Sequence, residues 1–173
     1  MIEAATRRRQ ANVTGGLRVR LLVATWAEAL PLLGFGPRVT GMGRRDWDLS
    51  GCDAVISAGF AGACQPGLRP GDILLAGGVP AGLGERLGAV SGELRTLGHI
   101  AGPAEKAALG REGVAAVDME TAWLQAACEV PFLAVRVIID RVQDRPLGLA
   151  TARHYLLACT RLRRAVAAAK GFQ

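Results

Sequence analysis

The sequence contains no cysteine pair of the kind that builds a disulfide framework or a zinc site. Four cysteines occur in 173 residues, and none belongs to a C-x-x-C pair or a zinc-ligand spacing. They are Cys52, Cys64, Cys128 and Cys159. Because free cysteine is among the most buried residue types, we expect reduced thiols in the core. We therefore predict no metal ion and no cofactor.

A membrane-spanning segment is also missing. Half of the residues are hydrophobic, but no window of about 18 residues is both apolar and uncharged. Residues 1–16 are polar and include Arg7, Arg8 and Arg9 without a following apolar run, so they predict a flexible leader rather than a secretory signal. We expect a single domain over residues 17–173, located in the cytoplasm, because a chain of this length supports one core.

Lysine and aromatic residues are scarce. The net charge of +6 comes almost entirely from arginine, since Lys106 and Lys170 are the only lysines. A basic balance can indicate nucleic-acid binding. With one tyrosine and no aromatic residues interleaved among the arginines, however, the sequence has no base-stacking platform. We therefore predict no nucleic-acid partner.

The most informative stretch that is present runs from Ala115 to Arg141. A short apolar run ends at Asp118-Met119-Glu120, and a helix is expected from there to about Glu129. Pro131 then breaks the helix before Phe132–Ile139, whose continuous valine and isoleucine content predicts a strand buried on both faces. Asp140 follows that strand directly. Because ligands bind at the carboxyl ends of parallel strands, we expect the carboxylates of this stretch at one rim.

Similar patterns predict alternating strands and helices along the rest of the chain. The other predicted strands are Val19–Ala24, Arg38–Gly41, Asp53–Ala58, Ile73–Ala76 and Leu94–Ile100. The other predicted helices are Thr25–Leu33, Pro103–Leu109 and Thr151–Lys170. This alternation indicates an α/β protein, a three-layer α/β/α sandwich with a mostly parallel central sheet.

Three segments carry a resemblance to a known family. They are V-D-M-E-T-A with V-P-F-L-A-V-R-V-I-I-D, then D-A-V-I-S-A-G-F-A-G-A with L-R-P-G-D-I-L, and the weaker V-A-T-W-A-E-A. These segments, which keep the family's order along the chain, resemble the family 1 purine nucleoside phosphorylases and nucleosidases, which include methylthioadenosine/S-adenosylhomocysteine nucleosidase. The Asp-Met-Glu variant and Ala104–Leu109 are similar to the hopanoid-associated branch. The resemblance implies a nucleoside phosphorylase-like fold and cleavage of an N-glycosidic bond.

The resemblance also implies roles for individual residues. Asp140 would protonate N7 of a departing purine, and Glu28 would position the attacking water. Glu120 would accept hydrogen bonds from the ribose hydroxyls, with Met119 against the sugar. Asp118 stands where the family more often has Glu, and as a residue just before a helix it is also an N-cap candidate.

A second group of residues is expected to support substrate binding. Gly59, Phe60 and Ala61 lie in a small-residue stretch that we interpret as a turn after a strand, where a ligand can approach the backbone closely. Close helix packing without a ligand is the alternative. Arg136 is expected to pair with a carboxylate and orient it. The Gly41–Arg45 turn offers two cations for a phosphate, although a plain surface turn is the better explanation, because two-glycine turns are common.

The chain departs from the family pattern in ways that leave its activity open. It is shorter than family members at Gly34–Thr40, at Val79–Glu93 and after Asp144, so we expect a shallower pocket. Phe60 replaces a small hydroxyl residue that helps to hold phosphate in phosphorylases. We predict a nucleosidase acting with water on an adenosine-like nucleoside. Phosphorolysis and non-catalytic purine binding are the alternatives. By the same resemblance, we expect a homo-oligomer, a dimer or larger.

Overall fold

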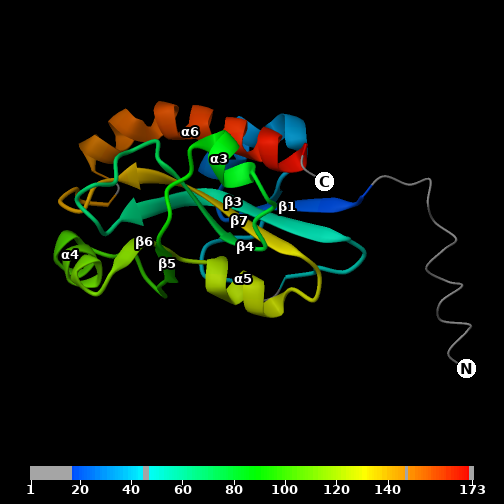
Figure 1. Ribbon diagram of the computed structural model, residues 1–173, viewed down its shortest axis with the longest axis horizontal. Coiled ribbons are helices and arrows are strands. Elements are labelled where there is room, and N and C mark those ends of the chain that lie inside the picture. The colour runs from blue at the N-terminus through cyan, green and yellow to red at the C-terminus, as the bar shows by residue number, and fades with distance from the viewer. Residues whose placement is uncertain (1–16, 45–46, 147, 172–173) are drawn as a thin grey trace, which may run out of the picture.

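The computed structural model describes residues 17–44, 47–146 and 148–171, so the predicted leader at residues 1–16 lies outside the described residues. A sheet of seven strands separates two layers of helices in this part of the chain (Figure 1). The strands are β1 (Val19–Val23), β2 (Arg38–Val39), β3 (Ala54–Ala63), β4 (Ile73–Gly77), β5 (Glu93–Thr96), β6 (Val114–Asp118) and β7 (Phe132–Asp140). The helices are α2 (Trp26–Ala29), the 3-10 helix η1 (Leu30–Phe35), α3 (Leu83–Leu87), α4 (Pro103–Arg111), α5 (Thr121–Ala127) and α6 (Leu149–Lys170).

Strand β3 organises the sheet. It pairs in parallel with β1 on one side and with β7 on the other, and its last residues pair antiparallel with β6. Strand β2 runs parallel to β1, β5 runs parallel to β6, and β4 runs antiparallel to β7. The predicted α/β sandwich with a mostly parallel sheet is confirmed. In Figure 1, α6, α3 and α2 lie above the sheet, whereas α5 and α4 lie below it.

The core lies on both faces of the sheet, because successive side chains of a strand point to opposite faces. In β7, Leu133, Val135 and Val137 pack into a cluster with α6 residues, whereas Phe132 and Ala134 pack with Leu124 of α5. Both faces of this strand are therefore covered by helices, which explains its unbroken apolar sequence. The same burial brings Asp140, the last residue of β7, to the edge of the core.

The predicted turn after Ala58 is wrong. Strand β3 continues to Ala63, and residues 59–61 pair in register with Arg136, Val137 and Ile138 of β7. Small residues inside a strand often mark a place where another group approaches the backbone closely, as happens at Gly59. A Cβ on Gly59 would lie 2.5 Å from the Oε1 atom of Glu28. The glycine therefore makes room for a carboxylate of the protein itself.

Smaller differences concern the ends of elements. Strand β5 is shorter than the predicted Leu94–Ile100, and α5 ends at Ala127 rather than Glu129. The predicted helix Thr25–Leu33 is a short α2 followed by η1, because Pro31 at the start of η1 has no N–H for a continuous α-helix. Within the described residues, no helix is long and apolar enough to cross a membrane.

Candidate active site

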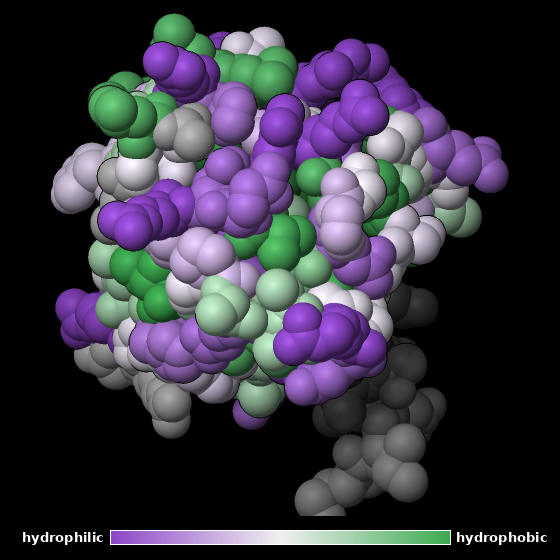
Figure 2. Space-filling view, turned by 90° about the vertical axis from the view of Figure 1, so that its left-hand side faces the viewer, coloured by the Kyte–Doolittle hydropathy of each residue, from purple (hydrophilic) through white to green (hydrophobic). Residues whose placement is uncertain are grey.

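A cavity of about 150 Å³ opens at the rim where β6 and β7 end. Figure 2 looks onto this side of the molecule, where hydrophobic surface lies between hydrophilic side chains. Most of the residues predicted for the site line the cavity: Glu28, Phe60, Ala61, Asp118, Met119, Glu120 and Asp140. Gly59 and Arg136 lie outside its lining. A second cavity of about 450 Å³ shares Glu28, Phe60 and Asp140 with the first and extends to Tyr155 of α6.

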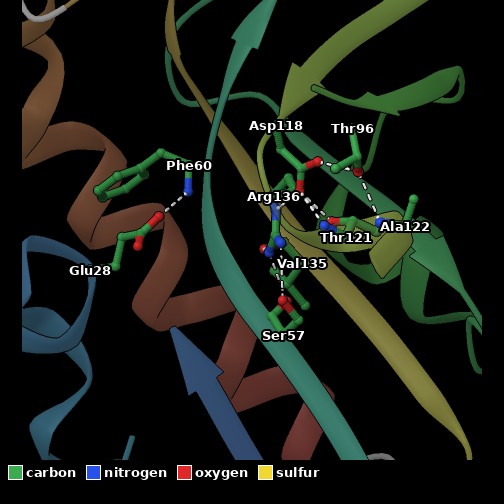
Figure 3. A network of polar contacts seen from close by, with 9 residues as sticks. All are labelled: Glu28, Ser57, Phe60, Thr96, Asp118, Thr121, Ala122, Val135 and Arg136. Atoms are coloured by element: carbon green, nitrogen blue, oxygen red, sulfur yellow. Dashed lines mark hydrogen bonds and ion pairs between the residues drawn. The ribbon is translucent and has the colours of Figure 1, made fainter. Parts of the chain in front are cut away.

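Glu28 is held by the start of its own helix and by strand β3. Its Oε2 accepts hydrogen bonds from the backbone N–H (2.9 Å) and hydroxyl (3.0 Å) of Thr25, completing a capping box at the N-terminus of α2. Its Oε1 accepts the backbone N–H of Phe60 at 2.9 Å. Figure 3 shows this carboxylate directed at the strand. The geometry fixes the carboxylate in place at the wall of the cavity.

Asp118, which lines the cavity, forms a buried ion pair with Arg136 (Figure 3). The Nε of Arg136 donates to Asp118 Oδ2 at 2.8 Å, and the other end of the guanidinium donates to the carbonyl and hydroxyl of Ser57. Asp118 Oδ1 accepts the Thr96 hydroxyl at 2.7 Å, and Oδ2 accepts both the backbone N–H (3.1 Å) and the hydroxyl of Thr121. The prediction that Arg136 pairs with a carboxylate is confirmed.

The charge state of Asp118 follows from these contacts. Burial by itself raises the pKa of Asp118, but the Arg136 charge and the hydrogen bonds from Thr121 and Thr96 outweigh burial, so the pKa is lowered. The N-cap prediction for Asp118 is wrong, because Glu120 occupies the N-cap position of α5. Asp118 still contacts the start of that helix, since its Oδ2 accepts the backbone N–H of Thr121. Asp118 is thus an ionised anchor that joins β6, β7 and α5.

Glu120 is the least compensated carboxylate of the site. It is buried, and burial raises its pKa to about 7. The Arg136 charge opposes this rise, and the carboxylates of Glu28 and Asp118 add to it. A hydrogen bond from the backbone of Gly43 partly stabilises the ionised form. Glu120 is therefore poised to change protonation near neutral pH.

Asp140 is paired with a residue that the sequence interpretation did not include. The Nζ of Lys106, from α4, lies 2.6 Å from Asp140 Oδ1, and both side chains are buried. Burial raises the pKa of Asp140, and the hydrogen bond and charge of Lys106 oppose that rise. The signal in the sequence is that Lys106 is one of only two lysines in an arginine-rich chain.

Phe60 and the Gly41–Arg45 turn are the two features that bear on phosphate binding. The ring of Phe60 packs edge-on against Tyr155, with centroids 5.9 Å apart, and brings no donor to the cavity. Gly41 and Gly43 have φ values of 85° and 70°, so the turn requires glycine at these positions, and Met42 between them lines the cavity. Arg45 lies outside the described residues.

His99, to which the sequence assigned no role, also reaches the cavity. It lines the wall and its Nε2 lies 2.9 Å from the carboxylate of Glu105. Among the described residues, no group of three histidine, cysteine or acidic side chains is arranged to hold a metal ion.

Comparisons with known proteins identify the fold. No protein-family model and no curated protein matches the chain. Futalosine hydrolase of Helicobacter pylori superposes with a TM-score of 0.72 at 16% identity, covering 88% of this chain and 96% of that one. A mutant 5′-methylthioadenosine nucleosidase of the same organism, with 5′-methylthioadenosine in its active site, gives 0.73 at 16% identity, covering 88% and 97%. The Neisseria meningitidis 5′-methylthioadenosine/S-adenosylhomocysteine nucleosidase, in complex with methylthio-immucillin-A, gives 0.71 at 19% identity, covering 87% and 96%. At these identities the likeness establishes a shared nucleosidase-type fold.

Proposed function

We propose that the protein is a nucleosidase that hydrolyses the N-glycosidic bond of a purine, adenosine-like nucleoside and releases free base and sugar. The observation that carries this proposal is the convergence of Glu28, Glu120 and Asp140 on one cavity in a fold shared with nucleosidases. The two relatives that hold 5′-methylthioadenosine or methylthio-immucillin-A support a nucleoside as the substrate.

The chemistry of the reaction matches the properties of the three carboxyl groups. Cleavage passes through an oxocarbenium-like sugar, so it needs an acid at the leaving base and a positioned water. Asp140, whose pKa is raised by burial against the opposing effect of Lys106, is suited to protonate N7 of the base. Glu28 is rigidly held and orients the water. Glu120 binds the ribose hydroxyls, and Met119 packs against the sugar.

Hydrolysis is favoured over phosphorolysis because of Phe60. A phosphate ion in the site needs hydrogen-bond donors, and its charge is costly to bury without them. Phe60 offers a phenyl ring, and its backbone N–H is already donated to Glu28. Non-catalytic purine binding on the same scaffold is the second candidate, favoured by the openness that the shortened Val79–Glu93 stretch implies.

Three finer assignments complete the proposal. The segment Ala104–Leu109 and the Asp-Met-Glu variant favour the hopanoid-associated branch of the family. A cytoplasmic location is the second of these assignments. Exposed apolar residues on α2, η1 and α6 favour a homo-oligomer.

The test is an assay for base release. The protein is incubated with adenosine, inosine and 5′-modified adenosines, with and without inorganic phosphate, and the products are separated. We expect free base and free sugar at a rate that phosphate does not change. Ribose 1-phosphate, or a rate that rises saturably with phosphate, would show a phosphorylase. If no base appears while a purine still raises the melting temperature, the protein is a binder.

A further inference from the structure

Lys106 is the most deeply buried charged side chain that the roles above leave unassigned. It lies on α4, is only 1% exposed, and yet contributes to the wall of the candidate active site. Its ammonium group contacts three oxygen atoms: Asp140 Oδ1 at 2.6 Å, the carbonyl of Arg141 at 2.6 Å and the carbonyl of Asp144 at 3.2 Å. An ammonium group has three N–H bonds, so each is used. Lys106 has no donor left for a substrate.

These contacts join Asp140 to the loop that follows it. The loop is closed on itself, because the N–H of Arg141 donates to Asp144 Oδ2 at 2.9 Å and the N–H of Asp144 donates to the Arg141 carbonyl at 3.1 Å. Through its ammonium group, Lys106 therefore connects α4 to the end of β7 and to this loop. Among the described residues, the hydrogen bonds to the Asp140 carboxylate reach Oδ1, which leaves Oδ2 for a ligand.

Strand β3 is shaped to permit this arrangement. A Cβ on Gly62 would lie 3.0 Å from Asp140 Oδ1 and 3.4 Å from Cδ of Lys106. The glycine thus leaves space for both members of the pair. A buried ion pair is a weak source of stability, since apolar residues of similar size often serve as well. A function for the pair explains its presence better than stability does.

We propose that Lys106 is the positioning residue for Asp140: it fixes the carboxylate through Oδ1, directs Oδ2 to the substrate, and supplies the positive charge that controls when Asp140 holds a proton. This inference rests on the proposed nucleosidase function for its catalytic meaning. The geometry of the pair can be tested without that function.

Other titratable groups face Asp140 as well. Asp144 in the loop raises the pKa of Asp140, and His154 on α6 lowers it, both to a smaller extent than burial and Lys106. Cys64 at the end of β3 lies near the pair, but burial raises the pKa of its thiol to about 11, so it stays neutral in the physiological range. Lys106 is therefore the group whose removal should change the titration of Asp140 most.

The experiment compares the wild type with Lys106→Met, which keeps the length and apolar stem, and Lys106→Gln, which keeps a hydrogen-bond donor without the charge. Lys170→Met is the matched control, because Lys170 donates to the carbonyl of Phe35 at the far end of α6. The carboxyl resonances of 13C-labelled aspartate are titrated in each protein, and Asp140→Asn identifies the Asp140 signal. Melting curves establish that each variant is folded.

We expect the Asp140 midpoint to move to higher pH in Lys106→Met and Lys106→Gln and to stay unchanged in Lys170→Met, because loss of the cation leaves burial unopposed. The alkaline limb of kcat/KM for base release should move in the same direction. In Lys106→Met, kcat should fall about 10²-fold, the loss expected when a reacting group is misplaced by about 1 Å. Lys106→Gln should recover part of kcat without restoring the midpoint.

The outcomes separate the two proposals. An Asp140 midpoint that is the same in wild type and folded Lys106→Met overturns the role of Lys106, whatever the activity. A wild type that releases no base from any nucleoside, while the midpoint still shifts in Lys106→Met, supports the coupling and overturns the nucleosidase function instead.

Discussion

At the scale of single residues, the site contains carboxyl groups with three different environments. Asp118 is kept ionised by Arg136, Glu120 has a pKa raised to about 7, and the pKa of Asp140 is raised by burial against Lys106. Neighbouring carboxyl groups whose environments separate their pKa values are the usual basis for dividing acid, base and binding roles. The separation agrees with a structural role for Asp118 and with the roles proposed above, binding for Glu120 and proton transfer for Asp140.

Asp140→Asn tests the proposed acid. The amide keeps the shape of the side chain and cannot deliver the proton, so base release should fall about 10²-fold or more, as is typical for loss of a general acid. Nucleoside binding, measured by calorimetry, should persist. Asp53→Asn is the control, because Asp53 pairs with Arg18 at the opposite end of β3. Wild-type turnover in Asp140→Asn would exclude the role.

Glu120→Gln tests the charge state of the binding carboxylate through stability. The pKa of Glu120 is raised from 4.5 to about 7 in the folded protein, so the folded state binds a proton that the unfolded chain releases over this range. Stability from this group is therefore present below pH 4.5 and lost as the pH rises through about 7. Glutamine carries no charge at any pH.

The melting temperature of Glu120→Gln should consequently exceed that of the wild type at pH 8, and the advantage should vanish near pH 5. Glu85→Gln, on the exposed surface of α3, provides the comparison for loss of a glutamate in general. An advantage of Glu120→Gln that is equal at both pH values would contradict the raised pKa.

The sequence predicts the carboxylates that follow strands, but it does not predict the residues of distant elements that hydrogen-bond to those carboxylates. Asp140 and Glu120 were predictable because a carboxylate after a buried strand lies at the ligand-binding rim. Lys106 and Thr96 were not, because each contacts its carboxylate across 22 or more positions of sequence. Such pairing depends on the placement of α4 and β5 beside β6, and no local pattern encodes it.

At the scale of elements, the main error of the sequence interpretation concerns β3. Glycine and alanine at positions 58, 59, 61 and 62 suggested a turn, whereas these residues lie in the second half of a strand. Propensity favoured the turn, but the pairing with β7 and the space required by Glu28 and Asp140 decided the structure. The long strand matters for the site, because it carries Phe60, Ala61 and Gly62 into the cavity wall.

Arg136→Met tests how strongly β6 and β7 depend on the buried ion pair. Removal of the guanidinium leaves Asp118 buried without its counter-ion, which should cost about 3–5 kcal/mol in the free energy of unfolding. Asp118→Asn combined with Arg136→Met should recover part of that loss, since the uncompensated charge is gone. Urea unfolding followed by circular dichroism measures the effect.

Arg95→Met is the matched control for this prediction. Arg95 pairs with Glu93 and Glu112 at distances of 2.9 and 2.7 Å, but these side chains are 35%, 50% and 58% exposed, respectively. Exposed pairs contribute about 1 kcal/mol or less, so the control should change little. If Arg136→Met is no more destabilising than Arg95→Met, the buried pair does not hold these strands together.

At the scale of the whole molecule, the three layers leave apolar residues uncovered on one side. Trp26, Leu30 and Leu33 are each at least 60% exposed and follow one another along α2 and η1. Leu149 and Leu156, seven residues apart on α6, are 84% and 76% exposed. Helices α2 and α6 are neighbours, because the Tyr155 hydroxyl of α6 donates to the carbonyl of Ala27 in α2 at 2.6 Å. Exposed large apolar residues gathered on neighbouring elements are typical of an interaction site.

A second copy of the chain is the partner we predict for this surface. The same layer contains Tyr155, which borders the larger cavity beside the site, so a second chain docked here would lie next to that cavity. Light scattering at micromolar concentration should therefore give the mass of a dimer or larger. Leu30→Glu and Leu156→Glu should each shift the protein toward monomer, because a charge buried at an interface without a partner is costly. Leu17→Glu, an equally exposed position at the other end of β1 from Trp26, should leave the mass unchanged. A wild-type monomer at these concentrations would mean that the cavity is completed by one chain alone, and base release by that monomer would show that the open pocket is sufficient.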